Sequence, residues 1–263
     1  MNTKVLMKKM QTKWSSPIQY FIQTDEGILN INTLIGKHIS FVLVDSICLS
    51  CGEHRDIFAQ GFCKNCFFTV PEAGQWIMKP ELCTAHLDIE DRDLKYEKEV
   101  QLQDHFVYLA KTSAIKVGVT RHNQIPFRWI DQGADEATPI LKTPNRYLAG
   151  KAEVVLKQYL TDKTSWQKML KGISTSKELI DTKNEIKKYI PDELLAYWIE
   201  ENKLTYLDFP IEKYPEKVKS INLSKLHTFE GKLEGIKGQY LVFEGGKVMN
   251  VRSHSGYVVE WKF

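Results

Sequence analysis

The sequence lacks the roughly 18 uninterrupted apolar residues that a membrane-spanning helix needs. Its first 14 residues include four lysines but are not followed by the apolar core of an export signal. We therefore expect a cytoplasmic protein with no membrane partner. Disorder as the main state is excluded, because 43% of the 263 residues are hydrophobic, enough for one large domain or a few small ones.

Net charge is also small, at +3, so it does not by itself predict binding to nucleic acid. The distribution is uneven, however: residues 81–104 hold eight acids and three bases, whereas residues 151–190 hold nine lysines and five acids. Two interpretations are open: a basic helical region set against an acidic linker, or two solvated faces. The chain has no Gly-Lys-Ser/Thr loop to hold phosphates, which argues against a nucleotide-hydrolysing motor.

Cysteine is scarce, and its spacing is informative. Four of the five cysteines form two C-x2-C pairs separated by eleven residues, the spacing of a tetrahedral zinc site with four thiolate ligands: Cys48, Cys51, Cys63 and Cys66. Because four thiolates leave no open coordination position, we expect the zinc to be structural. Cys83 and His86 are either half of a second ligand set or a small buried thiol beside a surface histidine.

Apolar patterning divides the chain into sheet and helix. Short alternating runs separated by turn residues predict strands in 17–44 and in the last forty residues. Between them, two short strands form a hairpin and a helix over 124–132 ends at Gly133. The charged run 88–99 reads as a polar helix or linker, and helices are expected from Pro144, at 164–171, at 176–190 and after Pro191.

The stretch 105–132 resembles the core of the GIY-YIG nucleases, in which two strands carry the two motifs and later helices carry an arginine and a glutamate. Val107-Tyr108 takes the place of the first motif, with Phe106 where a glycine is usual. Lys116-Val117-Gly118 takes the place of the second, with a lysine instead of the tyrosine. Arg128 matches the helix arginine, and Glu153 is the candidate metal ligand.

This resemblance implies an endonuclease that hydrolyses phosphodiester bonds with Mg²⁺ or Mn²⁺. In it Tyr108 would orient or deprotonate water, Arg128 would hold the phosphate and Glu153 would bind the divalent ion, while Lys116 would contact phosphate or lower the pKa of the tyrosine. We add Arg121 and Lys157 as candidate substrate-binding residues.

Nearly the whole chain also resembles an uncharacterised prokaryotic family known as domain of unknown function 2797. The matching segments are Cys48-x2-Cys51, Gln60 to Cys66, Met78 to Cys83, Lys116 to Arg121, Ile125 to Ala134 and Gly235 to Leu241. This family implies no established activity.

Together these features predict an α+β fold: a small GIY-YIG-like αβ core with a four-cysteine zinc knuckle inserted, flanked by N- and C-terminal strands that form a β subdomain. The expected segments are N-terminal strands in 1–47, the zinc-binding segment and acidic linker in 48–100, the αβ core with helices in 101–200, and a C-terminal β region in 201–263 packed with the first.

Each candidate residue also has a purely structural interpretation. Tyr108 suits a packed strand, while Arg128 is three residues before Asp131 and Glu153 four before Lys157, the spacings of helix ion pairs. Three functions therefore stay open at this point. The protein is an endonuclease, or a noncatalytic DNA- or RNA-binding module that uses the lysine-rich region and its aromatic residues, or an adaptor that binds a protein partner.

Overall fold

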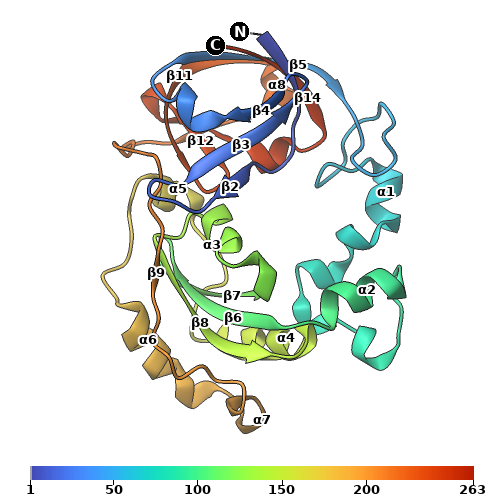
Figure 1. Cartoon of the computed structure of the whole chain (residues 1–263), viewed down its shortest axis with the longest axis vertical. Helices are drawn as coiled ribbons and strands as arrows, with labels where there is room; N and C mark the ends of the chain where they lie inside the picture. The colour runs from blue at the N-terminus through green and yellow to red at the C-terminus, as the bar shows by residue number, and fades with distance from the viewer. Residues whose placement is uncertain (1) are drawn as a thin grey trace. The chain divides into compact units, whose positions relative to one another are not determined.

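The computed structural model describes residues 2–263 and confirms the mixed α+β class (Figure 1). The chain forms two compact units. The first combines the residues up to Thr69 with Asp208–Phe263, and the second is Val70–Leu207. Within residues 2–263, no helix is both long and apolar enough to cross a bilayer.

The first unit is mainly β. A seven-stranded sheet has the order β1 (Asn2–Leu6), β14 (Tyr257–Lys262), β5 (His38–Ser46), β11 (Thr228–Lys237), β12 (Tyr240–Phe243), β13 (Lys247–Asn250) and β10 (Lys219–Ile221). A three-stranded sheet has the order β2 (Gln11–Lys13), β3 (Gln19–Thr24) and β4 (Gly27–Asn30), and two short helices complete the unit, α1 (Lys64–Thr69) and α8 (Leu223–Leu226).

Strands from the two ends of the chain pair directly in the larger sheet. β14 lies between β1 and β5 and is antiparallel to both, and β5 also pairs with β11. The alternating apolar residues of these strands meet in a buried aromatic cluster, in which Phe41 contacts the rings of Phe229, Phe243 and Trp261. The two terminal regions therefore form one β subdomain, because neither could bury its apolar face alone.

The second unit is an αβ layer built on a four-stranded sheet. Its strands have the order β7 (Ile115–Arg121), β6 (His105–Lys111), β8 (Glu136–Thr143) and β9 (Thr205–Tyr206). Its helices are α2 (Leu94–Gln101), α3 (Phe127–Asp131), α4 (Arg146–Leu156), α5 (Trp166–Leu170), α6 (Leu179–Ile186) and α7 (Asp192–Leu195).

Successive side chains of β6 point to opposite faces of this sheet, and each face is covered by different helices. Val107 and Leu109 belong to the apolar core that includes residues of α4 and α6, such as Ala152 and Leu179. Tyr108 points the other way and packs edge to face on Trp129 of α3, with ring centroids 5.9 Å apart. Since β7 is the outer strand, residues of α3 and α4 can meet around its edge.

Some expected boundaries differ from those observed. The helix expected over 124–132 begins only at Phe127, because Ile125 before Pro126 adopts an extended conformation, as residues before proline usually do. The charged run 88–99 contributes to α2 rather than to a linker, and its Glu97 is buried, accepting backbone N–H bonds from Asp91 and Arg92. The segment 48–100, expected as one region, is divided between the two units at Thr69.

Candidate functional site

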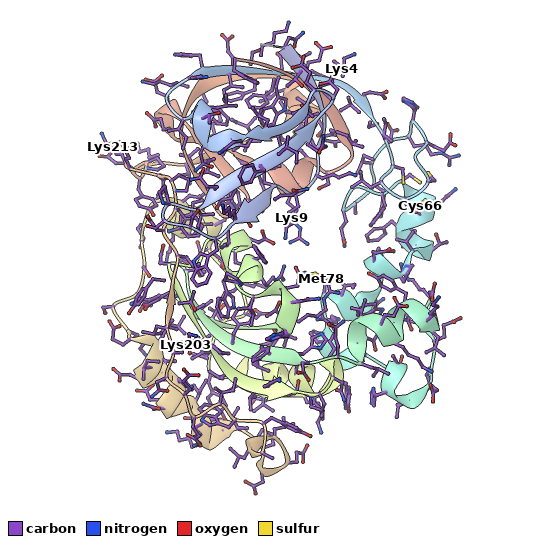
Figure 2. All side chains as sticks on the ribbon, in the orientation of Figure 1. Lys4, Lys9, Cys66, Met78, Lys203 and Lys213 are labelled. Atoms are coloured by element: carbon purple, nitrogen blue, oxygen red, sulfur yellow. The ribbon has the colours of Figure 1, made fainter. Side chains whose placement is uncertain are left out.

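The four cysteines of the C-x2-C pairs lie together in the first unit. Their sulfur atoms are all within 4.8 Å of one another, which positions them to bind one metal ion and is consistent with structural zinc. Cys48 follows β5, whereas Cys66 lies in α1, on the segment where Figure 2 labels it. The backbone N–H of Cys63 donates to Cys48 Sγ at 3.2 Å, which ties the two halves of the cluster together.

The chemistry of these thiols fits a cation. Burial raises the pKa of Cys48, but N–H groups of Cys63, Cys51 and Ser50 outweigh it and lower that pKa to about 6. For Cys66 the Ser50 side chain lowers the pKa, yet burial and the three neighbouring thiols together raise it to about 11. Four sulfurs this close cannot all ionise alone, so a divalent cation would stabilise the thiolates that repel one another.

Cys83 and His86 do not extend this cluster. Cys83 is buried in the second unit, and His86 stacks on the ring of Tyr147 at 4.4 Å between centroids. Within residues 2–263, no group of three or more potential ligands contains either Cys83 or His86.

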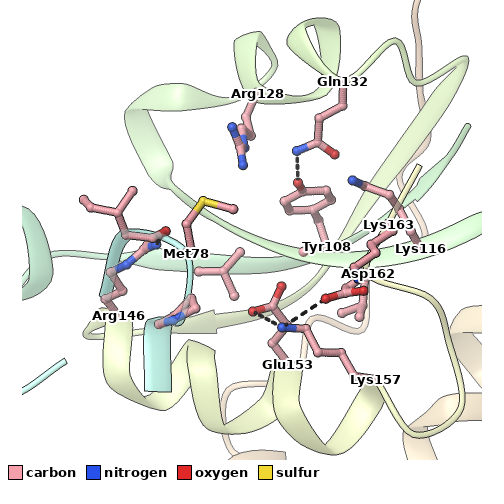
Figure 3. A pocket seen from close by; sticks show the side chains of 15 residues that line it. Met78, Tyr108, Lys116, Arg128, Gln132, Arg146, Glu153, Lys157, Asp162 and Lys163 are labelled. Atoms are coloured by element: carbon pink, nitrogen blue, oxygen red, sulfur yellow. Dashed lines mark hydrogen bonds and ion pairs between the residues drawn. The ribbon is translucent and has the colours of Figure 1, made fainter. Parts of the chain in front are cut away.

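The second unit contains a cavity of about 190 Å³ beside β7, and five of the six non-cysteine candidate residues line it (Figure 3). They come from two strands, two helices and the residue that follows the second helix: Tyr108, Lys116, Arg128, Glu153 and Lys157. Arg121, the sixth, does not line this cavity. The cavity lining includes five basic side chains against two acidic ones, which favours an anionic ligand.

Tyr108 is held rigidly inside the cavity wall. Its side chain is buried, and its hydroxyl accepts a hydrogen bond from Gln132 Nε2 at 2.5 Å. Gly118 lies opposite on β7, where an added Cβ would come within 2.5 Å of that hydroxyl oxygen. Only glycine therefore lets the phenol lie across the strand. Burial raises the pKa of Tyr108 although the Arg128 charge opposes it, so at neutral pH the hydroxyl is protonated and can donate.

Lys116 and Arg128 supply positive charge to the cavity, and the acids that line it, Glu153 and Asp162, pair with Lys157 instead. Neither side chain forms an ion pair with a carboxylate anywhere in residues 2–263, which removes the expected alternative of an Arg128–Asp131 pair. Lys116 is only 7% exposed, and burial, with a contribution from Arg128, lowers its pKa to about 8. Lys116 is therefore mostly charged at pH 7, but near pH 8 a substantial fraction of it is neutral.

The acidic side of the cavity is a small ion-pair network. Lys157 Nζ lies 3.3 Å from Glu153 Oε2 and 3.5 Å from Asp162 Oδ2, as the dashed lines in Figure 3 indicate. The helix pair between Glu153 and Lys157 considered from the sequence is thus formed. Burial raises the pKa of Glu153, and the Glu81 carboxylate adds to the rise, while Lys157 opposes it.

Arg146 fixes the wall opposite this network. Its Nη2 donates to the carbonyl oxygen of Ile77 at 2.8 Å, and its guanidinium lies 5.9 Å from the centre of the Trp76 ring. One turn further along α4, an added Cβ on Gly150 would meet the backbone of Pro80 at 2.5 Å. This close approach lets the segment 77–80 form part of the cavity lining.

Sequence reasoning missed four polar residues of this cavity. Two could have been found from helical spacing, since Gln132 is four residues after Arg128 and Arg146 is seven before Glu153 on α4. Asp162 and Lys163 lie in an irregular segment that carries no periodic signal. Thr161 in that segment bridges to Lys116 on β7, and this tertiary contact brings its neighbours to the cavity.

No curated protein and no solved structure matches this chain. A model of the family described as "Protein of unknown function (DUF2797)" matches residues 36–259, most of the length, and the chain therefore belongs to that family.

Proposed function

We propose that the protein binds nucleic acid and that the cavity beside β7 holds a backbone phosphate for hydrolysis, as in a GIY-YIG-like endonuclease stabilised by zinc at the four cysteines. The observation that carries this proposal is the convergence of Tyr108, Lys116, Arg128 and Glu153 on one cavity from separate elements. Each residue alone has a structural explanation, but a cavity with excess positive charge, a buried phenol and a buried carboxylate suits a phosphodiester.

The roles follow from the geometry. Arg128, which has no carboxylate partner, is available for a bidentate contact with two phosphate oxygens. The Tyr108 hydroxyl already accepts from Gln132, so its own proton is free to be donated to a phosphate oxygen or to the attacking water. Lys116, whose pKa is about 8, supplies charge below that pH and accepts a proton from water above it.

A divalent cation would fit beside Glu153 under one condition. Glu153 and Asp162 both reach Lys157 Nζ within 3.5 Å, so two hard oxygen ligands approach one point. Mg²⁺ or Mn²⁺ commonly takes one or two carboxylates and completes its shell with substrate and water. Such an ion would activate water and neutralise developing charge. For it to bind there, Lys157 must leave the position between the two carboxylates.

A noncatalytic nucleic-acid-binding module is the second candidate, and the same network favours it. Lys157 already neutralises the carboxylates of Glu153 and Asp162. In addition, Lys116 occupies the position at which the second GIY-YIG motif has its tyrosine. In this case the cavity binds a backbone phosphate but does not hydrolyse the phosphodiester bond. The two candidates share the phosphate site and differ only in whether Glu153 takes part in chemistry.

The test incubates wild-type protein with end-labelled single-stranded DNA, double-stranded DNA and structured RNA, with Mg²⁺, Mn²⁺ or EDTA, and records retention and cleavage together. Glu153→Gln is compared with Glu99→Gln, which changes an exposed glutamate on α2. The endonuclease proposal expects cleavage by wild type and Glu99→Gln but not by Glu153→Gln, with binding within a few-fold of wild type.

Arg128→Ala should weaken binding by about 10- to 150-fold, the effect of losing a charged hydrogen bond. Retention without cleavage by every protein would select the binding module instead. Failure of wild type to bind any of these nucleic acids would refute both candidates and leave the protein adaptor expected as the third function.

A further inference from the structure

A second, larger cavity of about 660 Å³ lies on the other side of the segment that closes the phosphate pocket. Leu160 and Thr161 line this second cavity, whereas Asp162 and Lys163, next in the chain, line the first. Adjacent Cα atoms are about 3.8 Å apart, so the two cavities share one wall. Thr161 accepts a hydrogen bond from Val117 N at 3.0 Å, which fixes this wall against β7.

Two tyrosines form an aromatic platform in the second cavity. The rings of Tyr159, just after α4, and Tyr189, just after α6, are stacked with centroids 3.6 Å apart and planes inclined by only 9°. Lys188 Nζ lies 5.0 Å from the centre of the Tyr189 ring. Tyr189 is thus in contact with both neighbours, whereas Tyr159 is 49% exposed and presents the larger free aromatic surface.

The surroundings of the platform match a nucleotide better than an apolar side chain. Lys177 and Lys188 are exposed at the cavity, against a single acid, Glu185. An aromatic face beside cationic groups is the usual means of holding an unpaired base and its backbone, because stacking recognises the base and the charges recognise phosphate. Tyr159, 49% exposed at this cavity, therefore offers a ring face to such a base.

We propose that the stacked pair Tyr159/Tyr189 binds an unpaired base of single-stranded nucleic acid, next to the phosphate held in the cavity beside β7. This inference rests on the proposed function and adds to it a base-stacking subsite and a preference for single strands or unpaired segments. Tyr159 supplies the stacking surface, Tyr189 holds that ring from behind, and Lys188 lies against the Tyr189 ring.

The experiment measures binding of single-stranded DNA and RNA oligonucleotides that carry 2-aminopurine, whose fluorescence is quenched on stacking. Wild type is compared with Tyr159→Leu, which keeps apolar volume without an aromatic face, and with Tyr159→Phe, which keeps the ring. Tyr206→Leu is the matched control, because Tyr206 is 68% exposed on β9 in the same unit and lines neither cavity. Thermal melting checks that each variant is folded.

We expect wild type, Tyr159→Phe and Tyr206→Leu to quench the probe equally. Tyr159→Leu should lose the quenching and bind about 5- to 150-fold more weakly, the range for one stacked base. If Tyr159→Leu binds and quenches as well as Tyr206→Leu, the subsite is overturned while the phosphate site is left intact. The subsite is likewise overturned if Tyr159→Phe does not keep the quenching of wild type. If wild type binds no oligonucleotide, the proposed function fails and the subsite with it.

Discussion

His105, at the start of β6, should make the stability of this protein fall steeply in mild acid. The side chain is fully buried, and its Nδ1 lies 2.7 Å from the carbonyl oxygen of Gln103. Its Nε2 has no hydrogen-bond partner in residues 2–263. Burial, which outweighs the hydrogen bond to Gln103, lowers the pKa of His105 from 6.5 to about 4. Folding therefore favours the neutral imidazole.

Proton linkage gives the direction in which the free energy of unfolding changes with pH. Between about pH 6.5 and 4 the unfolded chain binds a proton that the folded chain excludes, so stability is lost as pH falls through this window. The full difference in pKa corresponds to about 3 kcal/mol in the free energy of unfolding, and about 2 kcal/mol of it is lost by pH 5. That loss is a large part of the stability of an ordinary domain.

The assay is urea unfolding followed by circular dichroism at pH 7.5 and pH 5, with His105→Asn as the comparison. An asparagine amide still donates to the Gln103 carbonyl but does not titrate. Because all other groups are shared, the difference between the two proteins isolates His105. Wild type should lose about 2 kcal/mol more than the variant between the two pH values. Equal losses would refute the assignment of a buried, neutral imidazole.

Two further predictions concern the candidate sites. Freshly purified protein should contain one equivalent of zinc. Cys63→Ser should lose the metal and melt at a lower temperature, whereas Cys83→Ala should keep it. Full zinc in Cys63→Ser would contradict the four-cysteine centre. Oligonucleotide affinity should be constant well below pH 8 and fall as pH rises through about 8, by at most tenfold per pH unit, because Lys116 then loses its charge. Lys116→Arg should abolish that dependence. A wild-type profile in this variant would exclude Lys116 from the phosphate site.

The sequence by itself determined the features that depend on local spacing. The two C-x2-C pairs predict a metal centre because a knuckle brings two sulfurs together over three residues, and the structure places all four within 4.8 Å. Short apolar runs predict the strands, and because successive side chains of a strand point to opposite faces, Val107 and Tyr108 do so in β6. Both follow from the geometry of a few neighbouring residues.

Only the tertiary structure decided how distant segments meet. Strand pairing between the two ends of the chain depends on hydrogen bonds between β1, β14 and β5, for which alternation gives no partner. The cavity beside β7 needs the bridge from Lys116 to Thr161 and the approach of Pro80 to Gly150, which are contacts between residues far apart in sequence. The stacking of Tyr159 on Tyr189 arises in the same way, because two helix ends thirty residues apart are brought together by burial of their apolar faces on one sheet.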